Sequence, residues 1–190
     1  MFKSITAAAA LTLGLAPLTA CMTMDPNAGM TSVTVGGAPM YASRSIVENA
    51  VNSPDHTTLV AAVKAAGLVD TLSGAGPFTV FAPTNDAFAK LPAGTVDTLL
   101  QPANLATLRS VLTYHVVPGR VTAQQLMAMI RAGGGEARLT TVQGGTLTAR
   151  MMGGRVMLID AKGGMAHVTQ ADVMQSNGVI HVTDAVSMPG

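Results

Sequence analysis

Pairs of small turn residues divide the second half of this chain into short segments, and their spacing limits the folds it can adopt. The pairs are Gly144-Gly145, Gly153-Gly154, Gly163-Gly164 and Asn177-Gly178. Such dipeptides reach the positive φ angles of tight hairpin turns at little energetic cost. The intervening segments are rich in β-branched and apolar residues, and strands are expected over 138–142, 146–151, 156–160, 166–168 and 179–182. The second half is therefore predicted to form an antiparallel sheet.

The first half carries helix signals instead. Ser53-Pro54-Asp55 combines a capping residue, a first-turn proline and an acidic residue at a helix start, and Gly67 follows as the stop. One strand is expected at 78–82, between two prolines. Helices are expected at 45–51, 53–66, 68–72, 84–91, 95–100, 105–115 and 123–131. Helices followed by strands predict an α+β domain over 43–190.

The first 21 residues have the features of an export signal. Lys3 provides a positive charge, and the apolar run that follows is shorter than the roughly 20 residues needed to span a bilayer. Leu18-Thr19-Ala20-Cys21 then resembles the bacterial lipobox, in which the cysteine receives a lipid. The alternative is a plain signal peptide that happens to end near a cysteine. Because Cys21 is the only cysteine, the exported domain is expected to fold as a disulfide-free monomer.

Residues 22–42 are rich in Gly, Pro, Ser and Thr and show little periodicity, so a flexible tether between lipid and domain is expected. The predicted location is the membrane surface outside the cytoplasm. Met22 follows the cysteine in place of the aspartate that retains lipoproteins in the inner membrane of enterobacteria. We therefore expect the outer membrane, at its periplasmic face or at the cell surface, with the lipid as the only membrane contact.

Three segments, in order, resemble the fasciclin domain. They are the first box at 76–88 (GPFTVFAPTNDAF), the central Tyr114-His115-Val116-Val117, and the closing box at 176–186 (SNGVIHVTDAV) with Met188-Pro189 after it. The residues that carry the two long boxes are Phe78, Phe81, Pro83, Thr84, Asn85, Phe88, Asn177, Gly178, Ile180, His181 and Asp184. The resemblance implies an α+β wedge with an antiparallel-rich, seven-stranded sheet and flanking helices. It also implies a cell-surface adhesion module without catalysis or cofactor.

The Tyr114-His115 pair allows two interpretations. In animal members of the resembled family this element has been linked to integrin binding, which would make both side chains a contact site. The structural alternative is a half-buried histidine that ties the end of a helix to a nearby backbone carbonyl, and we favour it. By the same reasoning His181, in the middle of a strand, is expected to be structural. His56 lies in the first turn of a helix and is expected to be exposed.

Composition and spacing exclude several classes of function. The formal net charge is +1 and the arginines are scattered singly, whereas a nucleic-acid binder needs clustered cations. The four histidines show no metal-ligand spacing, so no metal site is predicted. There is no Gly-x-Ser-x-Gly turn that would present a nucleophilic serine. We therefore expect no enzyme and no cofactor.

The chain contains thirteen methionines but no tryptophan, and only 3% of its residues are aromatic. Eight lie in the second half, and seven of them precede the closing box: Met127, Met129, Met151, Met152, Met157, Met165 and Met174. Three roles remain open for them, namely core filling (favoured), the lining of an adaptable apolar groove, and thioether ligation of Cu(I).

Two functions follow from these observations. The first is an envelope module that mediates adhesion by binding a protein or polysaccharide at the cell surface. The alternative is a carrier of a small apolar molecule, such as a carotenoid or a lipid, since some members of the resembled family bind carotenoids and the many Ala and Met residues allow an apolar cleft.

Overall fold

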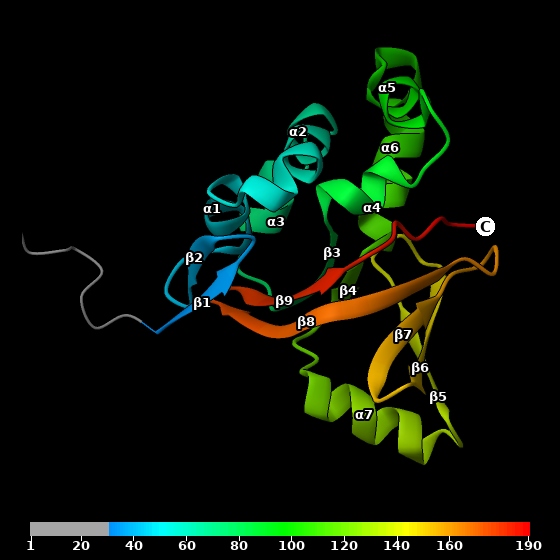
Figure 1. Ribbon diagram of the computed structural model, residues 1–190. Helices are drawn as coiled ribbons and strands as arrows, with labels where there is room; N and C mark the ends of the chain where they lie inside the picture. Colours follow the sequence, from blue (N-terminus) through cyan, green and yellow to red (C-terminus); the bar gives the residue numbers. More distant parts are fainter. Residues whose placement is uncertain (1–30) are drawn as a thin grey trace, which may run out of the picture.

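A seven-stranded mixed sheet organises residues 31–190, the part of the chain that the computed structural model describes (Figure 1). The strand order is β4-β3-β9-β8-β7-β6-β5, and every neighbouring pair is antiparallel except β3 and β9, which run parallel. The seven strands are β3 (Phe78–Pro83), β4 (Val116–Pro118), β5 (Glu136–Thr140), β6 (Thr146–Met152), β7 (Arg155–Ile159), β8 (Met165–Gln175) and β9 (Gly178–Thr183). The predicted α+β class and antiparallel-rich, seven-stranded sheet are confirmed.

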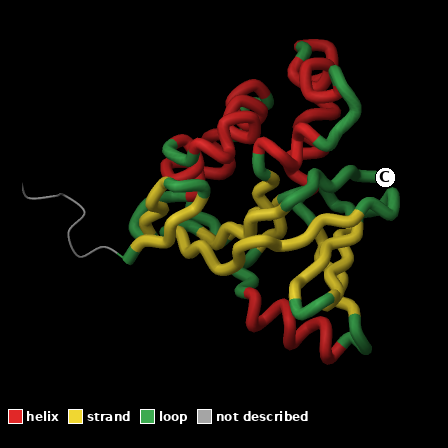
Figure 2. The backbone as a smooth tube through the Cα atoms, in the orientation of Figure 1, coloured by secondary structure: helices red, strands yellow, loops and turns green. Residues whose placement is uncertain are grey.

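Helices flank the sheet on two sides. Helices α1 to α6 lie on one side and α7 lies on the other, as the labels of Figure 1 and the red segments of Figure 2 show. They are α1 (Ile46–Val51), α2 (Thr57–Ala65), α3 (Val69–Ser73), α4 (Asn85–Ala89), α5 (Thr95–Leu100), α6 (Leu105–Tyr114) and α7 (Ala123–Ala132), with short 3-10 turns at Pro54–His56 and Pro102–Asn104. Capping residues explain where three of these helices begin. Ser45 with Glu48 forms a capping box at the start of α1, Thr122 with Gln125 forms one at the start of α7, and Thr84 caps α4.

Strand β8 bends the sheet. It is eleven residues long, although the sequence predicted only 166–168, because polar residues interrupt its apolar pattern at a bulge. At that bulge Asp172 adopts a left-handed conformation with φ 57°. Its carboxylate accepts a hydrogen bond from the Ala123 backbone N–H at 2.7 Å, which places the start of α7 beneath the sheet. The bulge thus separates the half of the sheet that faces the six helices from the half that faces α7.

Two apolar clusters result from this bend. One lies between the six helices and strands β3, β8 and β9, and it contains Val63, Val80, Leu112 and Ile180. The other lies between α7 and strands β5 to β8, and it contains Phe81, Tyr114 and Leu126. The Val142 N–H donates to the Val116 carbonyl at 2.7 Å, so the region after β5 also closes against β4.

The segment predicted as a tether is partly folded. Residues 32–41 form a hairpin of β1 (Ser32–Val35) and β2 (Ala38–Tyr41), so the prediction of a flexible tether over 22–42 is wrong for this part. Val35 and Met40 are buried against the first cluster. Asn49 holds the hairpin end, since its amide oxygen accepts from the Tyr41 N–H and its amide nitrogen donates to the Tyr41 carbonyl. One buried apolar residue on each strand decides the packing, and this signal is too short to stand out in the sequence. Cys21 and the predicted export signal lie outside the described residues.

The buried hairpin gives a first prediction. Met40→Ala should lower the free energy of unfolding by about 2–5 kcal/mol, because it removes a buried side chain and leaves a cavity. Thr34→Ala, on the exposed face of the same hairpin, should change it by no more than about 0.5 kcal/mol. Urea unfolding followed by circular dichroism measures both. Equal stability of the two variants would mean that the hairpin does not pack on the domain.

Candidate functional site

The Tyr114 side chain joins three separate parts of the chain. Tyr114 ends α6, and its side chain is fully buried in the second cluster. Its hydroxyl donates to the Thr146 carbonyl at 2.6 Å and accepts from the Ala161 N–H at 3.0 Å. Burial raises the pKa of this hydroxyl, so it stays protonated and able to donate. The residue therefore ties α6 to the start of β6 and to the loop after β7.

His115 performs a similar task on the other side of the backbone. Its Nδ1 lies 2.8 Å from the Val111 carbonyl, which has no partner within the helix, and its Nε2 accepts from the Ser187 N–H at 2.9 Å. These two bonds require the neutral tautomer with the proton on Nδ1. Asp160 acts beside it, because its carboxylate accepts from the Met188 N–H at 2.7 Å. His115 and Asp160 together hold the C-terminal segment against α6.

Burial decides what the Tyr-His pair can contact. Only 3% of His115 is exposed, and none of Tyr114. A contact site needs exposed side chains, and this structure exposes neither. The pair holds backbone segments together here, as in the structural interpretation, although His115 is buried more deeply than the half-buried position expected.

The closing box joins the two ends of the domain. The Asn177 amide oxygen accepts from the Ile46 N–H, and its amide nitrogen donates to the Leu72 and Gly74 carbonyls at 2.8 and 2.9 Å. Next to it, a Cβ at Gly178 would collide with the Phe78 carbonyl, so only glycine allows β9 to approach β3. Ile180 is buried in the first cluster on the same strand.

The first box and the closing box pack against one another across the parallel pair. Phe81 stacks on His181 with ring centroids 5.5 Å apart, and both are buried. His181 Nε2 bonds to the Val121 carbonyl at 2.8 Å, which secures the segment before α7. Asp184, after β9, accepts from the His167 N–H and lies 3.8 Å from the Lys90 ammonium.

The remaining residues of the first box form its strand and the turn into α4. Pro83 and Phe88 are buried, Phe78 is partly buried, and the Thr84 hydroxyl accepts from the Ala87 N–H at 3.3 Å. The Asn85 amide oxygen accepts from the Thr58 N–H and its nitrogen donates to the Pro54 carbonyl. These residues therefore stabilise the strand and the start of α4 through packing and hydrogen bonds within the domain.

The prediction for His56 is wrong. We expected an exposed side chain, yet only 1% of it is accessible. Its Nδ1 lies 2.9 Å from the Ser53 hydroxyl, and Nε2 has no hydrogen-bond partner among residues 31–190. Residues 54–56 form a 3-10 turn rather than the first α-helical turn, so the ring points toward the core. The helix-start signal was present, but its local geometry was not readable from the sequence.

The favoured role of the methionines is also wrong for half of those in the second half. Of these eight, Met157 is buried. Met127, Met174 and Met188 are partly buried, and the other four are exposed, with exposed fractions from 39% for Met151 to 58% for Met165. The core is filled mostly by Val, Leu, Ile and Ala, and none of the eight methionines lines the groove described next.

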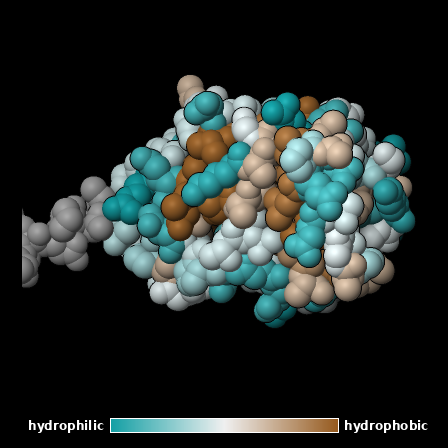
Figure 3. All heavy atoms as spheres, turned by 90° about the horizontal axis from the view of Figure 1, so that it is seen from above, coloured by the Kyte–Doolittle hydropathy of each residue, from teal (hydrophilic) through white to brown (hydrophobic). Residues whose placement is uncertain are grey.

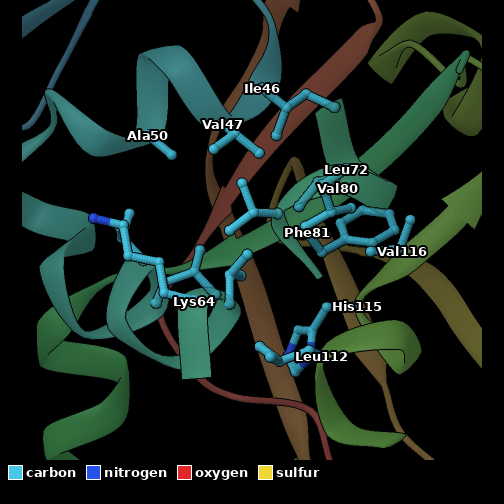
Figure 4. A pocket seen from close by; sticks show the side chains of 14 residues that line it. Ile46, Val47, Ala50, Lys64, Leu72, Val80, Phe81, Leu112, His115 and Val116 are labelled. Carbon is cyan, nitrogen blue, oxygen red and sulfur yellow. The ribbon is translucent and has the colours of Figure 1, made fainter. Parts of the chain in front are cut away.

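A narrow apolar groove lies between α1, α2, α3, α6 and strand β3. It encloses a volume of about 40 Å³. Most of the residues that line it are aliphatic; the lining consists of Ile46, Val47, Ala50, Leu59, Val60, Val63, Lys64, Val69, Leu72, Val80, Phe81, Leu112, His115 and Val116. Figure 4 shows these side chains converging from the helices and β3, and Figure 3 shows apolar atoms reaching the surface on the helical side. The sequence allowed an apolar cleft and singled out Phe81 and His115, but it did not indicate where the groove lies, because five elements must come together to form it.

Two further features of the described residues bear on chemistry. Within 31–190, no three His, Cys, Asp or Glu side chains are grouped so that they could hold a metal ion. None of the helices between these limits has the length and apolar character required to cross a bilayer.

Comparison with known proteins agrees with this architecture. The family model described as "Fasciclin domain" matches residues 54–189. "Protein sll1483" from Synechocystis is 49% identical over 158 residues, covering 83% of this chain and 81% of the relative. "Cell surface glycolipoprotein MPB83" from Mycobacterium bovis is 33% identical, covering 92% of this chain and 79% of the relative. The solved FAS1 domain pair from the insect cell adhesion molecule Fasciclin I superposes with a TM-score of 0.68 at 18% identity. That match covers 83% of this chain and 57% of the length of that one.

The contacts of the Tyr-His pair give a second prediction. His115→Ala should lower the free energy of unfolding by about 1–3 kcal/mol, because the buried Ser187 N–H and Val111 carbonyl lose their partner. Tyr114→Phe should cost about 0.5–1.5 kcal/mol, since water can reach the partly buried groups that its hydroxyl joins. Thr107→Ala, at an exposed position of the same helix, is the control. Thermal and urea unfolding measure all three. A His115→Ala variant as stable as the control would contradict the role assigned to the ring.

The buried histidines give a third prediction. Burial lowers the pKa of His56, His115 and His181 below the usual value of about 6.5, and it outweighs the carboxylates near each ring. The unfolded chain therefore binds protons more readily than the folded one. Their contribution to stability is complete above pH 6.5 and is lost as the pH falls through their folded pKa values.

The free energy of unfolding should accordingly drop between pH 7 and pH 5, by at most about 1.4 kcal/mol per pH unit for each histidine. Urea titrations at pH 7.5, 6.0 and 5.0 measure this change. Replacement of His181 by Gln should make the decline shallower. A stability that stays constant over this range would show that the three rings titrate normally in the folded protein.

Proposed function

This chain belongs to the fasciclin family, and from that membership we propose that it is a non-enzymatic interaction module of the bacterial envelope. In this role it binds a protein or a polysaccharide at the cell surface. The observation that carries the proposal is the match of the domain to a family whose relatives include cell-surface and adhesion proteins. The scattered arginines argue against a nucleic-acid partner. His115 and His181 bond to backbone groups and hold segments of the fold together.

The proposed attachment is a lipid on Cys21. The lipobox resemblance supports it, as does the name of the mycobacterial relative, a cell surface glycolipoprotein. The similarity to that relative covers 92% of this chain, more than residues 31–190 make up, so it extends into the leader. The proposed location is the outer membrane, at its periplasmic face or at the cell surface, because Met22 and not an aspartate follows Cys21.

The contact surface is proposed to lie outside the Tyr-His pair. Both of these side chains are buried, and a partner could reach them only if the C-terminal segment moved away from α6. The helical side is the better candidate because apolar atoms reach the surface there (Figure 3). Val51 on α1, for example, is 48% exposed.

A second candidate function is a carrier of a small apolar molecule, such as a carotenoid or a lipid. The apolar groove between α1, α2, α3, α6 and β3 favours it. Its lining is almost wholly hydrocarbon, and its volume of about 40 Å³ means that the surrounding helices would have to move apart to admit such a molecule.

One experiment tests the attachment and separates the two functions. The tagged full chain and its Cys21→Ser variant are expressed in a bacterium that processes lipoproteins, and cells are fractionated. The wild type should appear in the membrane fraction and the variant in the soluble periplasm or the medium, because the variant cannot accept the lipid. Mild crosslinking and pull-down from intact envelopes, followed by mass spectrometry and glycan analysis, should then identify a surface partner of the wild type. Solvent extraction of the same sample would reveal a carried pigment or lipid.

Thr23→Ala is the control, since it changes a nearby side chain without affecting the cysteine. Membrane association of Cys21→Ser equal to that of the control would contradict the lipid anchor. Recovery of a stoichiometric apolar molecule without any protein or polysaccharide would favour the carrier over the adhesion module.

A further inference from the structure

The outer face of strands β5, β6 and β7 is open to solvent. Alternate residues of these strands, such as Leu139 and Leu147, point the other way and pack in the second cluster, which α7 covers. The residues between them point outward, and most of those on β5 and β6 are exposed. We call this outer surface the arginine face, because it carries Arg138, Arg150 and Arg155.

The register of the strands brings these three arginines together. Arg138 on β5 is opposite Thr148 on β6, two positions before Arg150. Arg150 is in turn opposite Met157 on β7, two positions after Arg155. Arg138 and Arg155 are therefore both diagonal neighbours of Arg150, an arrangement in which residues of adjacent strands are about 7–8 Å apart. Arginines that are scattered singly in the sequence thus gather on one surface of the folded domain.

One carboxylate lies among these arginines. Glu136 is opposite Arg150, and its carboxylate lies 2.5 Å from the Arg150 guanidinium and 3.6 Å from that of Arg138. The hydrogen bond from Arg150 lowers the pKa of Glu136, so this carboxylate is ionised at neutral pH. Arg155 forms no ion pair within residues 31–190. Three cations and one anion leave the arginine face with a surplus of two positive charges.

The acidic residues near the edge of the arginine face do not cancel this surplus. Asp184 accepts from the His167 N–H and lies 3.8 Å from the Lys90 ammonium, so a cation already matches it. Asp160 is 8% exposed and accepts from the backbone N–H of Lys162, whose own exposed ammonium lies in the same loop. The other acidic residues of 31–190 lie at the bulge of β8 or on the helical side.

Threonine hydroxyls surround the arginines. Thr148 is opposite Arg138, and Thr140 is opposite Thr146 at one end of the same strand pair. The hydroxyls of these three threonines make no hydrogen bond within the described residues, so they can donate to a ligand and accept from it. The guanidinium of Arg155 has the planar fork that binds a carboxylate through two parallel hydrogen bonds. Together these groups are complementary to a polymer that bears both hydroxyls and carboxylates.

Two observations favour a sugar polymer over other anions. Strands β5, β6 and β7 carry no aromatic side chain, so the arginine face has no ring on which a nucleic-acid base could stack. These strands also lie at the opposite end of the domain from β1, where the described part of the chain begins (Figure 1). The proposed lipid on Cys21 precedes β1 in the chain, so the arginine face would lie away from the anchored end and could reach a polymer outside the bilayer.

From these observations we infer that the arginine face binds an acidic polysaccharide, with uronate carboxylates on Arg138, Arg150 and Arg155 and sugar hydroxyls on the neighbouring threonines. This inference rests on the envelope module proposed above and specifies the chemistry of one partner. It assigns that partner to a surface separate from the apolar helical side, which remains available to a protein.

Binding to immobilised polysaccharides tests the inference. The full chain carrying Cys21→Ser is purified without detergent and applied by interferometry to alginate, a linear polymer of uronic acids, and to dextran, a neutral polymer of glucose. We expect binding to alginate at neutral pH and none to dextran, because each uronate supplies the carboxylate that a guanidinium binds. The binding should weaken as the salt concentration rises, since the arginines are exposed.

Two double variants separate the arginine face from the charge of the whole domain. Arg138→Gln combined with Arg155→Gln should raise the Kd for alginate about tenfold, because each exposed ion pair contributes a factor of about two to five. Lys64→Gln combined with Arg131→Gln removes the same charge from exposed positions on α2 and α7, and should leave the Kd within about twofold. Urea unfolding checks that both variants fold.

The outcomes distinguish this inference from the function on which it rests. Equal losses in the two double variants would overturn the assignment to the arginine face. Binding of polyglutamate, single-stranded DNA or phosphatidylglycerol vesicles as tightly as alginate would overturn the polysaccharide in favour of an acidic protein, a nucleic acid or a bilayer. Absence of alginate binding would overturn the inference but not the envelope module, which the pull-down from intact envelopes tests independently.

Discussion

The parallel pairing of β3 with β9 is the contact on which the rest of the structure depends. It joins the first box to the closing box, which lie about a hundred residues apart, and it is the single parallel pair of the seven-stranded sheet. Gly178 allows the two backbones to approach, and Asn177 ties the same corner to α1 and to the end of α3. One face of the pair carries Val80 and Ile180 toward the helices, and the other carries Phe81 and His181 toward α7. Both apolar clusters are therefore anchored on the same two strands.

Buried histidines hold together segments that are distant in the chain. His115 secures the C-terminal segment, and His181 secures the segment before α7. Each ring accepts a backbone N–H through one nitrogen while the other nitrogen contacts a carbonyl. Such an arrangement requires a neutral ring, because a protonated nitrogen cannot accept a hydrogen bond. Because protonation of these rings breaks such bonds, the stability of the fold depends on pH near the pKa of histidine.

The aliphatic composition explains why the groove exists. Tryptophan is absent, and the cluster beneath the six helices is built mostly from Val, Leu, Ile and Ala. These side chains are short, so helices that meet at an angle over a twisted sheet leave space between them that larger rings could have filled. The scarcity of large aromatic rings thus leaves a groove lined by hydrocarbon side chains.

The sequence by itself determined the elements and the family. Capping residues at Ser45, Thr84 and Thr122, the glycine pairs and the three boxes act through local backbone geometry, and they predicted most helices and strands close to their observed limits. Tertiary structure decided burial. The docking of the hairpin at 32–41, the inward position of His56, the exposure of half of the methionines in the second half and the assembly of the groove all depend on residues distant in sequence. Asn177 and Ile46, for example, are bonded across 131 positions. A local pattern specifies which conformation a segment adopts, but which of its faces is covered is set by the elements that pack against it.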